Sequence, residues 1–272
     1  MRQTLVLLAA IFTTASLFLS CQNDNSVSPD SLVSKQILDR IWDLGFSIEN
    51  VQKIEEGYLV EGDIILTEAD LNDHGDHITL RIADTEQYRT TNLVTGTPRT
   101  ITVSMDAQLN GIAGYSAALD TAIARYNARN LTLTFLRVGT SGGQIHLKKK
   151  VGNYLASAGF PTSTGNPYSQ IKINSNAIGS GNTLTFHKFC GSIIAHEMGH
   201  CIGLRHTDYF NRAISCGGAP SNEGSAGVGA ILIPGTPSGA TNAANSWMLA
   251  CVSMNQNRPF NPDDVIALEY LY

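Results

Sequence analysis

The sequence predicts an α+β fold in which helices pack against a β-sheet, and three observations support this class. Residues 112–129 carry apolar side chains at the spacing of an amphipathic helix, which suits a helix that covers a sheet. Residues 131–138 alternate apolar and polar side chains, and 144–148 and 170–174 are further short strands. Pro262 lies where a terminal helix is expected to begin, because proline is favoured in the first helical turn.

The remaining elements follow the same rules in chain order. Residues 34–44 have apolar side chains at helical spacing, and 58–66 form a strand that is interrupted at Gly62. A long helix is expected over 189–203. Residues 207–245 are rich in Gly, Pro and Ala and show no strong period, so a loop region is expected there.

The composition limits the kind of protein. The 272 residues include 18 Lys and Arg against 23 Asp and Glu, a formal charge of −5, which leaves no basic surface for nucleic acid. A hydrophobic content of 43% excludes a disordered chain and is sufficient for a substantial core. We therefore expect a monomeric globular protein with no nucleic-acid partner.

The first residues have the features of an export signal. Arg2 precedes an uncharged apolar run over 5–19, which is too short for a comfortable membrane span, so residues 1–20 are predicted to be a signal peptide. Residues 17–21, Leu-Phe-Leu-Ser-Cys, resemble a bacterial lipobox, in which the cysteine is acylated. Cys21 is thus expected to anchor an outer-membrane or cell-surface lipoprotein. A plain signal peptide, and hence a secreted protein, is the alternative.

Three histidines between 196 and 206 have the spacing of metal ligands. His196 and His200 are four residues apart, so on a helix both imidazoles lie on one face and can bind one ion. Gly203 permits the positive φ that ends a helix and lets the chain bring His206 to the same ion. Three imidazoles leave the fourth position of a zinc ion open, which is typical of a catalytic site.

Glu197 stands next to the first of these histidines, where its carboxylate can take a proton from a water activated by the metal. The string over 196–206 resembles the metzincin signature of zinc endopeptidases. With Thr207 and Asp208 it is most similar to the dual-action HEIGH metallopeptidases, a family of secreted bacterial peptidases.

The resemblance implies a zincin fold. Such a fold has a twisted mixed β-sheet with a backing helix and an active-site helix, followed by a C-terminal subdomain with a methionine turn and a terminal helix. It also implies one catalytic Zn²⁺ and protein or peptide substrates, with Glu197 as general base. Two alternatives are a catalytically silent zinc-binding surface lipoprotein and a non-peptidase hydrolase such as a deacylase.

The resemblance also implies a methionine beneath the metal and an edge strand beside it. Met248, in Ser-Trp-Met, is the best match for the methionine turn, and Met254 is the second candidate. Ala250 occupies the place where astacins and serralysins carry a Tyr that can join the zinc, so no such ligand is expected. A peptide substrate would pair antiparallel with the edge strand, for which both 144–148 and 170–174 are candidates.

Residues 60–64, Val-Glu-Gly-Asp-Ile, resemble the propeptide segment in which astacins place an aspartate on the zinc. Asp63 would then block the open position of the metal, because a carboxylate oxygen is a good zinc ligand. The alternative is a hairpin turn with a solvated Asp63. A polar stretch over 87–99 predicts the boundary, which gives a tether and prosegment over 22–98 and a catalytic domain over 99–272.

Four cysteines remain after the signal peptide, and export permits them to pair. Cys190 and Cys201 lie on the same expected helix, roughly 16 Å apart, and cannot bridge each other. The preferred bond joins Cys216 to Cys251, and a bridge from Cys201 to either of these two is the alternative.

Overall fold

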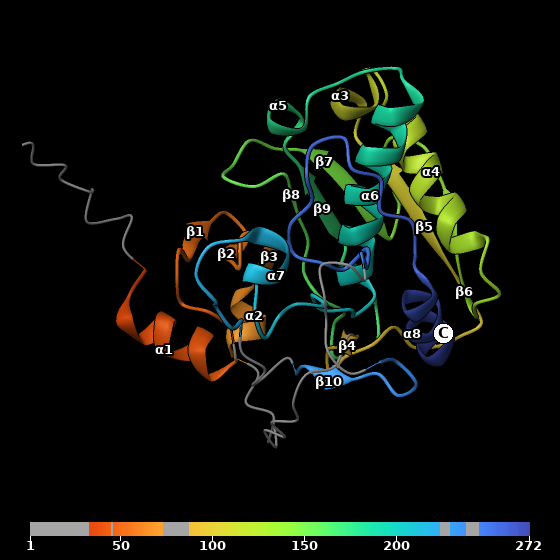
Figure 1. Ribbon diagram of the computed structural model, residues 1–272. Coiled ribbons are helices and arrows are strands. Elements are labelled where there is room, and N and C mark those ends of the chain that lie inside the picture. The colour runs from red at the N-terminus through yellow and green to blue at the C-terminus, as the bar shows by residue number, and fades with distance from the viewer. Residues whose placement is uncertain (1–32, 45, 73–86, 224–228, 238–244) are drawn as a thin grey trace, which may run out of the picture. The chain divides into compact units, whose positions relative to one another are not determined.

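A computed structural model describes residues 33–44, 46–72, 87–223, 229–237 and 245–272. Cys21, the signal peptide and most of the tether lie outside these residues. Within them the expected α+β class is confirmed, because a mixed five-stranded sheet packs against long helices (Figure 1). No helix in this described part of the chain combines the length and apolar character needed to cross a membrane.

The central sheet has the order β6-β5-β7-β9-β8. Four strands are parallel, and only β8 runs antiparallel to its neighbour β9. Neither strand proposed as the edge is one, because β7 lies between β5 and β9, and β9 lies between β7 and β8. The edges are β6 and β8, and the one next to β9 is β8, a strand too short to leave a pattern in the sequence. The bounds are β5 Arg99–Met105, β6 Leu133–Arg137, β7 Ile145–Lys149, β8 Ala156–Ser157 and β9 Gln170–Ile173.

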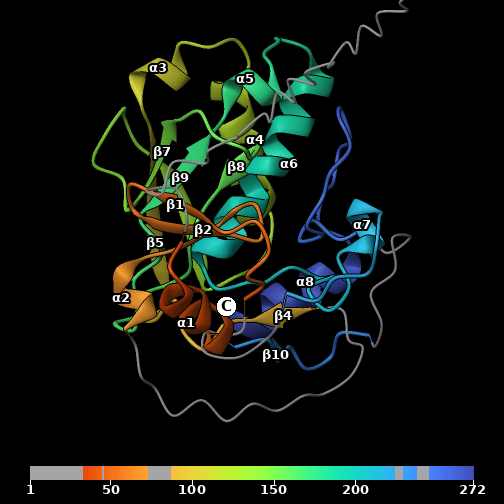
Figure 2. The same ribbon diagram turned by 90° about the vertical axis from the view of Figure 1, so that its left-hand side faces the viewer.

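Two long helices, α4 (Tyr115–Asn127) and α6 (Leu184–Cys201), lie side by side on one face of this sheet (Figure 2). Gly191 permits their close approach, because a Cβ there would lie 3.0 Å from the Cβ of Thr121. The expected start of the second helix at residue 189 is wrong. The helix begins at Leu184, after Thr183, whose hydroxyl accepts the Phe186 N–H and so caps the first turn.

The segment before α4 also departs from the expected single helix over 112–129. A short helix, α3 (Ala107–Asn110), is capped by Asp106, whose carboxylate accepts the Leu109 N–H. Gly114 then adopts a φ of 93°, which interrupts the helical path just before α4 starts. The sequence periodicity therefore located the buried face of α4 and placed its ends too far outward.

The N-terminal part has a small apolar core of its own, centred on Ile41, Phe46 and Val60. Its last strand lies parallel to the edge of the central sheet, where the Ile65 N–H donates to the Ala158 carbonyl at 2.8 Å and the Ala158 N–H donates to the Asp63 carbonyl at 2.9 Å. The hairpin over residues 57–66 thus pairs with Ala158, the residue that directly follows the edge strand. The elements are α1 Lys35–Asp43, β1 Gln52–Ile54, β2 Gly57–Val60, β3 Ile64–Leu66 and α2 Glu68–Leu71.

The C-terminal part follows α6 and contains few regular elements. The helix α8 is capped by Asn261, and Pro262 occupies its first turn, as expected. The Tyr272 hydroxyl, at the end of the chain, donates to the Ile202 carbonyl and so fastens α8 to the end of α6. The elements after α6 are α7 Ala213–Cys216, β10 Ile231–Leu232 and α8 Pro262–Leu271, and a short helix, α5 Ser175–Ile178, lies before α6.

Residues 87–98, which the sequence assigned to the prosegment, pack with the catalytic part of the molecule. The short strand β4 (Tyr88–Arg89) pairs with β10, and Gln87 is fully buried. The Thr90 N–H donates to the Gly203 carbonyl at 2.8 Å. This stretch supports the turn that follows α6 and is structurally distinct from an exposed linker.

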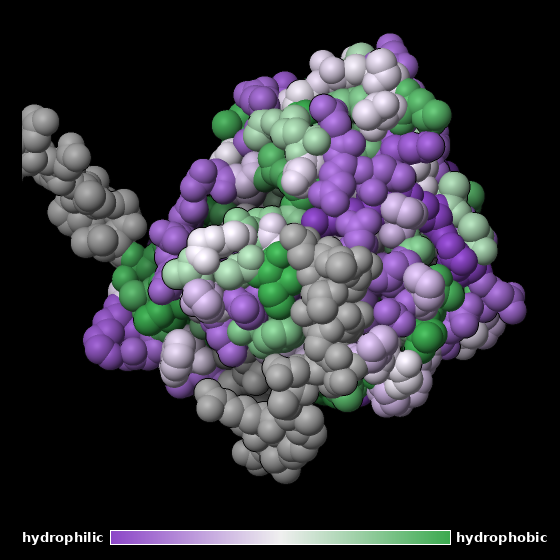
Figure 3. All heavy atoms as spheres, in the orientation of Figure 1, coloured by the Kyte–Doolittle hydropathy of each residue, from purple (hydrophilic) through white to green (hydrophobic). Residues whose placement is uncertain are grey.

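Large apolar side chains that reach the surface are scattered, and Trp42, Val151 and Met254 are among the most exposed. Figure 3 shows one face of the molecule, on which hydrophobic and hydrophilic residues are interspersed. Single exposed apolar residues are usual on soluble domains.

Candidate metal centre

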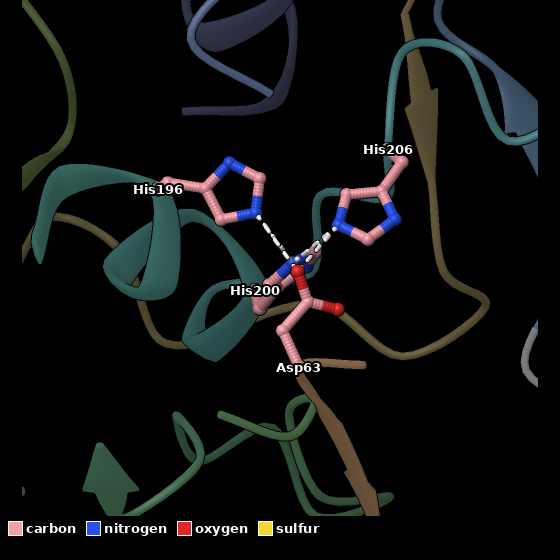
Figure 4. Close-up of side chains that lie close together, drawn as sticks. All are labelled: Asp63, His196, His200 and His206. Atoms are coloured by element: carbon pink, nitrogen blue, oxygen red, sulfur yellow. Dashed lines mark hydrogen bonds and ion pairs between the residues drawn. The ribbon is translucent and has the colours of Figure 1, made fainter. Parts of the chain in front are cut away.

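Three imidazole rings converge at the end of α6. His196 and His200 come from the last turns of the helix, and His206 comes from the segment that follows it. The Nε2 atom of His200 lies 3.1 Å from Nε2 of His196 and 3.2 Å from Nε2 of His206 (Figure 4). The structure therefore brings together the three side chains that the sequence selected.

Gly203 makes this convergence possible. Its φ is 107°, a value that side chains other than glycine rarely adopt. A Cβ at this position would lie 2.7 Å from the Leu93 side chain and 3.0 Å from the Asn92 carbonyl oxygen. The chain can reverse after α6 and return His206 to the helix only with glycine here.

Each imidazole is oriented by a partner at its other nitrogen. The Nδ1 atoms of His196 and His200 lie 2.8 Å from the carbonyl oxygens of Trp247 and Leu204, respectively. A carbonyl oxygen only accepts, so these Nδ1 atoms carry the hydrogen and each Nε2 presents a lone pair. Burial and the neighbouring imidazoles also hold the pKa of His200 well below its ordinary value.

The convergence of these lone pairs is the test of whether a metal fits. Nitrogen lone pairs about 3 Å apart repel one another unless a cation lies among them, and neutral imidazole is a preferred zinc ligand. One ligand atom from each of His196, His200, His206 and Asp63 lies within 4.8 Å of the others. The donor set of three nitrogens and one carboxylate oxygen fits Zn²⁺.

Asp63 reaches this centre from the turn between β2 and β3. Its Oδ2 atom lies 3.1 Å from Nε2 of His206 and 3.7 Å from Nε2 of His196, and its buried Oδ1 atom has no partner among the described residues. Burial alone would raise the pKa of Asp63, but the three imidazoles lower it well below its usual range. The turn that the sequence allowed as an alternative is present, and its aspartate points into the site.

Glu197 lies beside the same centre and is 3% exposed. Its Oε2 atom has no hydrogen-bond partner in the described part of the chain. Burial, together with the nearby Asp63 carboxylate, raises the pKa of Glu197 well above its ordinary value. The carboxylate forms part of the wall of a cavity of about 240 Å³. It is therefore buried, unpaired and next to space that a substrate could enter.

Met248 lies directly under α6. It is fully buried, and its Sδ atom is 2.6 Å from where a Cβ of Gly199 would stand, so the glycine between the two helical histidines leaves room for it. The Met248 carbonyl accepts the Thr207 N–H at 2.8 Å. Met254, the other candidate, is 58% exposed.

The structure contains a disulfide between Cys216 and Cys251, with their Cα atoms 5.1 Å apart. This bond joins α7 to the segment after Met248, which was the pairing preferred from the sequence. Cys190 and Cys201 are free and buried in α6, where burial raises the pKa of the Cys190 thiol to about 12.

A buried carboxylate that sequence reasoning missed is hydrogen-bonded to the third histidine. Glu223 accepts from Nδ1 of His206 at 2.8 Å and is held by Arg212 at 2.8 Å. Arg205, also buried, lies 3.3 Å from Glu61 and stacks over the Phe46 ring at 4.8 Å. Glu223 lies in the loop region over 207–245, whose sequence has no periodicity that could identify it. Arg205 lies inside the motif over 196–206.

A family model described as dual-action HEIGH metallo-peptidase matches residues 58–272. No curated protein matches the sequence.

Among solved structures, myroilysin is 16% identical with a TM-score of 0.30, and the match covers 44% of this chain and 54% of myroilysin, about half its length. High choriolytic enzyme 1, a hatching enzyme zinc-protease from the medaka fish Oryzias latipes, is 14% identical with a TM-score of 0.38, covering 63% of this chain and 88% of that one. Because the family model spans most of the sequence, the chain belongs to the dual-action HEIGH metallo-peptidase family.

Proposed function

We propose that this protein is a zinc-dependent endopeptidase that hydrolyses peptide bonds in proteins or peptides. The observation that carries the proposal is the convergence of three Nε2 lone pairs beside the unpaired carboxylate of Glu197. His196, His200 and His206 would hold the ion, and membership of a metallopeptidase family supports the assignment. Met248 would form the turn that supports the ligands from below.

Zinc bound there supplies a Lewis acid that lets water ionise near neutral pH and polarises a carbonyl group. Glu197 takes the proton from the water that attacks the scissile carbonyl, because its carboxylate is the unpaired base beside the site. It then delivers that proton to the leaving amine. Burial raises the pKa of Glu197, which favours its holding the proton between the two steps.

The N-terminal hairpin holds this enzyme in a latent state. The Asp63 carboxylate occupies the place beside the three imidazoles that a water or substrate needs. The adjoining strand β3 pairs with Ala158 directly after β8, the strand with which a peptide substrate would pair. Asp63 is therefore a zymogen switch, and its removal from the site is the activating event.

The protein acts outside the cytoplasm. Residues 1–20 direct export, and acylation of Cys21 anchors the chain to the outer membrane or cell surface as a monomer, while an unacylated chain would be secreted. The disulfide between Cys216 and Cys251 is consistent with an oxidising compartment. Labelling with a fatty acid, compared between the natural chain and Cys21→Ala, distinguishes anchored from secreted protein.

Digestion of casein or gelatin tests the activity. The activated protein is expected to degrade them, to stop when a chelator is added, and to resume when zinc is restored. Zinc binding without digestion would instead indicate a silent zinc-binding lipoprotein. Zinc-dependent release of acyl groups without peptide cleavage would indicate a deacylase. Absence of any zinc-dependent hydrolysis would contradict the proposal.

A further inference from the structure

The cavity beside Glu197 contains a buried arginine that the metal centre does not use. The cavity lies between α6 and the segment that follows Met248, and its volume is about 240 Å³. His196 and Glu197 form one end of it. A substrate residue next to the bond being cut would place its side chain in this space. Leu155, Ile193, Leu249 and Val252 contribute apolar surface to the wall, and the charged residues Glu61, Asp63 and Arg212 also line it.

Arg258 lines this cavity and is only 4% exposed. Its Nη1 group donates to the Leu249 carbonyl at 3.3 Å, and its buried Nε group has no partner among the described residues. No carboxylate in that part of the chain forms an ion pair with it. Burial lowers the pKa of Arg258, which reflects the same lack of compensation.

Arg258 differs in this respect from Arg205, the other fully enclosed arginine. Arg205 faces the carboxylates of Glu61 at 3.3 Å and Glu223 at 3.7 Å. Two carboxylates, those of Asp208 and Asp264, act on Arg258 without an ion pair. The Asp208 carboxylate is already bound by the Ala250 N–H at 2.9 Å and the Ser215 hydroxyl at 2.6 Å. The Asp264 carboxylate is bound by the Trp247 N–H at 3.1 Å and the Asn261 N–H at 2.9 Å. Burying a guanidinium without a counter-charge is costly, so Arg258 would be stabilised by a carboxylate that the described residues do not supply.

We propose that this cavity is a specificity pocket for an acidic side chain, Asp or Glu, of the substrate residue adjacent to the scissile bond, and that Arg258 recognises its carboxylate. The inference rests on the proposed peptidase function. A guanidinium and a carboxylate form short charge-assisted hydrogen bonds that are strengthened in a dry cavity. The apolar residues of the wall accommodate the methylene stem. Arg212, the second arginine in the wall, already pairs with Glu223, and Glu61 pairs with Arg205. Arg258 is therefore the arginine of this wall that has no carboxylate partner among the described residues.

Two peptide substrates that differ only by Glu or Gln at this position test the proposal, after a peptide library has located the position by mass spectrometry. The full chain with Asp63→Ala, which opens the site, is expected to cleave the Glu peptide with at least about tenfold higher kcat/KM, because a group built to bind a charge discriminates against its neutral analogue. Arg258→Gln is expected to bring this ratio to about one, and Arg258→Lys to keep part of it.

Arg137→Gln is the matched control, because Arg137 pairs with Asp120 on the surface and its loss should leave the ratio unchanged. A purely structural Arg258 would lower the cleavage of both peptides equally. Equal cleavage of the two peptides by the Asp63→Ala chain, or a ratio unaffected by Arg258→Gln, overturns the proposal. If Arg258→Gln does not fold, the proposal is tested by the ratio of kcat/KM for the Glu and Gln peptides, measured in the Asp63→Ala chain and in the Arg258→Lys variant. Failure to cleave either peptide in a chelator-sensitive way overturns the peptidase function itself.

Discussion

The carboxylate of Asp63 lies 3.1 Å from Nε2 of His206, although the two residues are separated by most of the folded chain. The contact joins the N-terminal hairpin to the third histidine of the metal centre (Figure 4). Two further contacts strengthen the attachment of the hairpin, since Glu61 pairs with Arg205 and its carbonyl accepts from Arg212. The hairpin is therefore bound to the centre through its turn.

Replacing Asp63 by Ala is expected to reduce latency. Without the Asp63 carboxylate the metal position is open, so the peptidase activity of the full chain should rise by at least about tenfold. A tenfold change corresponds to about 1.4 kcal/mol of lost stability of the closed state. Asp39→Ala is the control, because Asp39 pairs with Lys35 on the exposed face of α1 in the same hairpin-bearing unit. Cleavage of a quenched fluorescent peptide measures both, and equal latency in the two variants would discard the switch.

Glu197→Gln is expected to keep zinc and lose peptide cleavage. The amide cannot accept the proton from the attacking water. Loss of a general base typically lowers the rate by about 10²–10⁴-fold. Glu55→Gln, on an exposed side chain that pairs with Lys150, should leave both properties unchanged. Zinc content and kcat are measured on the same samples. A Glu197→Gln variant with near-native turnover would remove Glu197 from the mechanism.

Glu223→Gln is expected to weaken zinc binding. The Glu223 carboxylate accepts the Nδ1 hydrogen of His206 and so fixes the orientation of that ring and increases its basicity. Loss of such a partner usually lowers metal affinity by about 10–100-fold. Competition with a chromophoric chelator gives the affinity, with Glu55→Gln again as the surface control. Unchanged affinity would show that Glu223 does not position His206.

Gly203→Ala is expected to destabilise the protein more than Gly142→Ala. Both glycines have positive φ, so each substitution carries a strain of about 1–2 kcal/mol. Only at Gly203 would the new Cβ also meet neighbouring atoms, which adds about 1–3 kcal/mol of overpacking. Urea unfolding of the two variants measures the difference. Equal losses would mean that the turn after α6 tolerates a side chain.

The metal centre could be anticipated from the sequence because its histidines lie within one helix turn and one tight reversal. Local geometry places His196 and His200 on one face of α6, and Gly203 returns His206 to them. Glu223 could not be anticipated in the same way. Its contact with His206 depends on the path of a loop whose residues show neither period nor motif.

The fold class could likewise be predicted, whereas the sheet edge could not. Long amphipathic segments such as α4 carry their own pattern, but β8 has only two residues and depends on β9 and β3 for its pairing. The polar composition of residues 87–99 suggested a linker. The burial of Gln87 and Tyr88 within this stretch arises because β4 pairs with β10 far along the chain, a tertiary contact that composition does not record.

X-ray absorption at the zinc K edge of the purified full chain tests the central claim most directly. The account predicts one zinc ion per chain with three imidazole nitrogens at about 2.0–2.1 Å and an oxygen ligand at about 2.0–2.2 Å. His206→Ala should remove one of the nitrogens from this shell. A zinc shell containing sulfur at about 2.3 Å, or a spectrum unchanged by His206→Ala, would contradict the assignment of His196, His200 and His206 as the ligands.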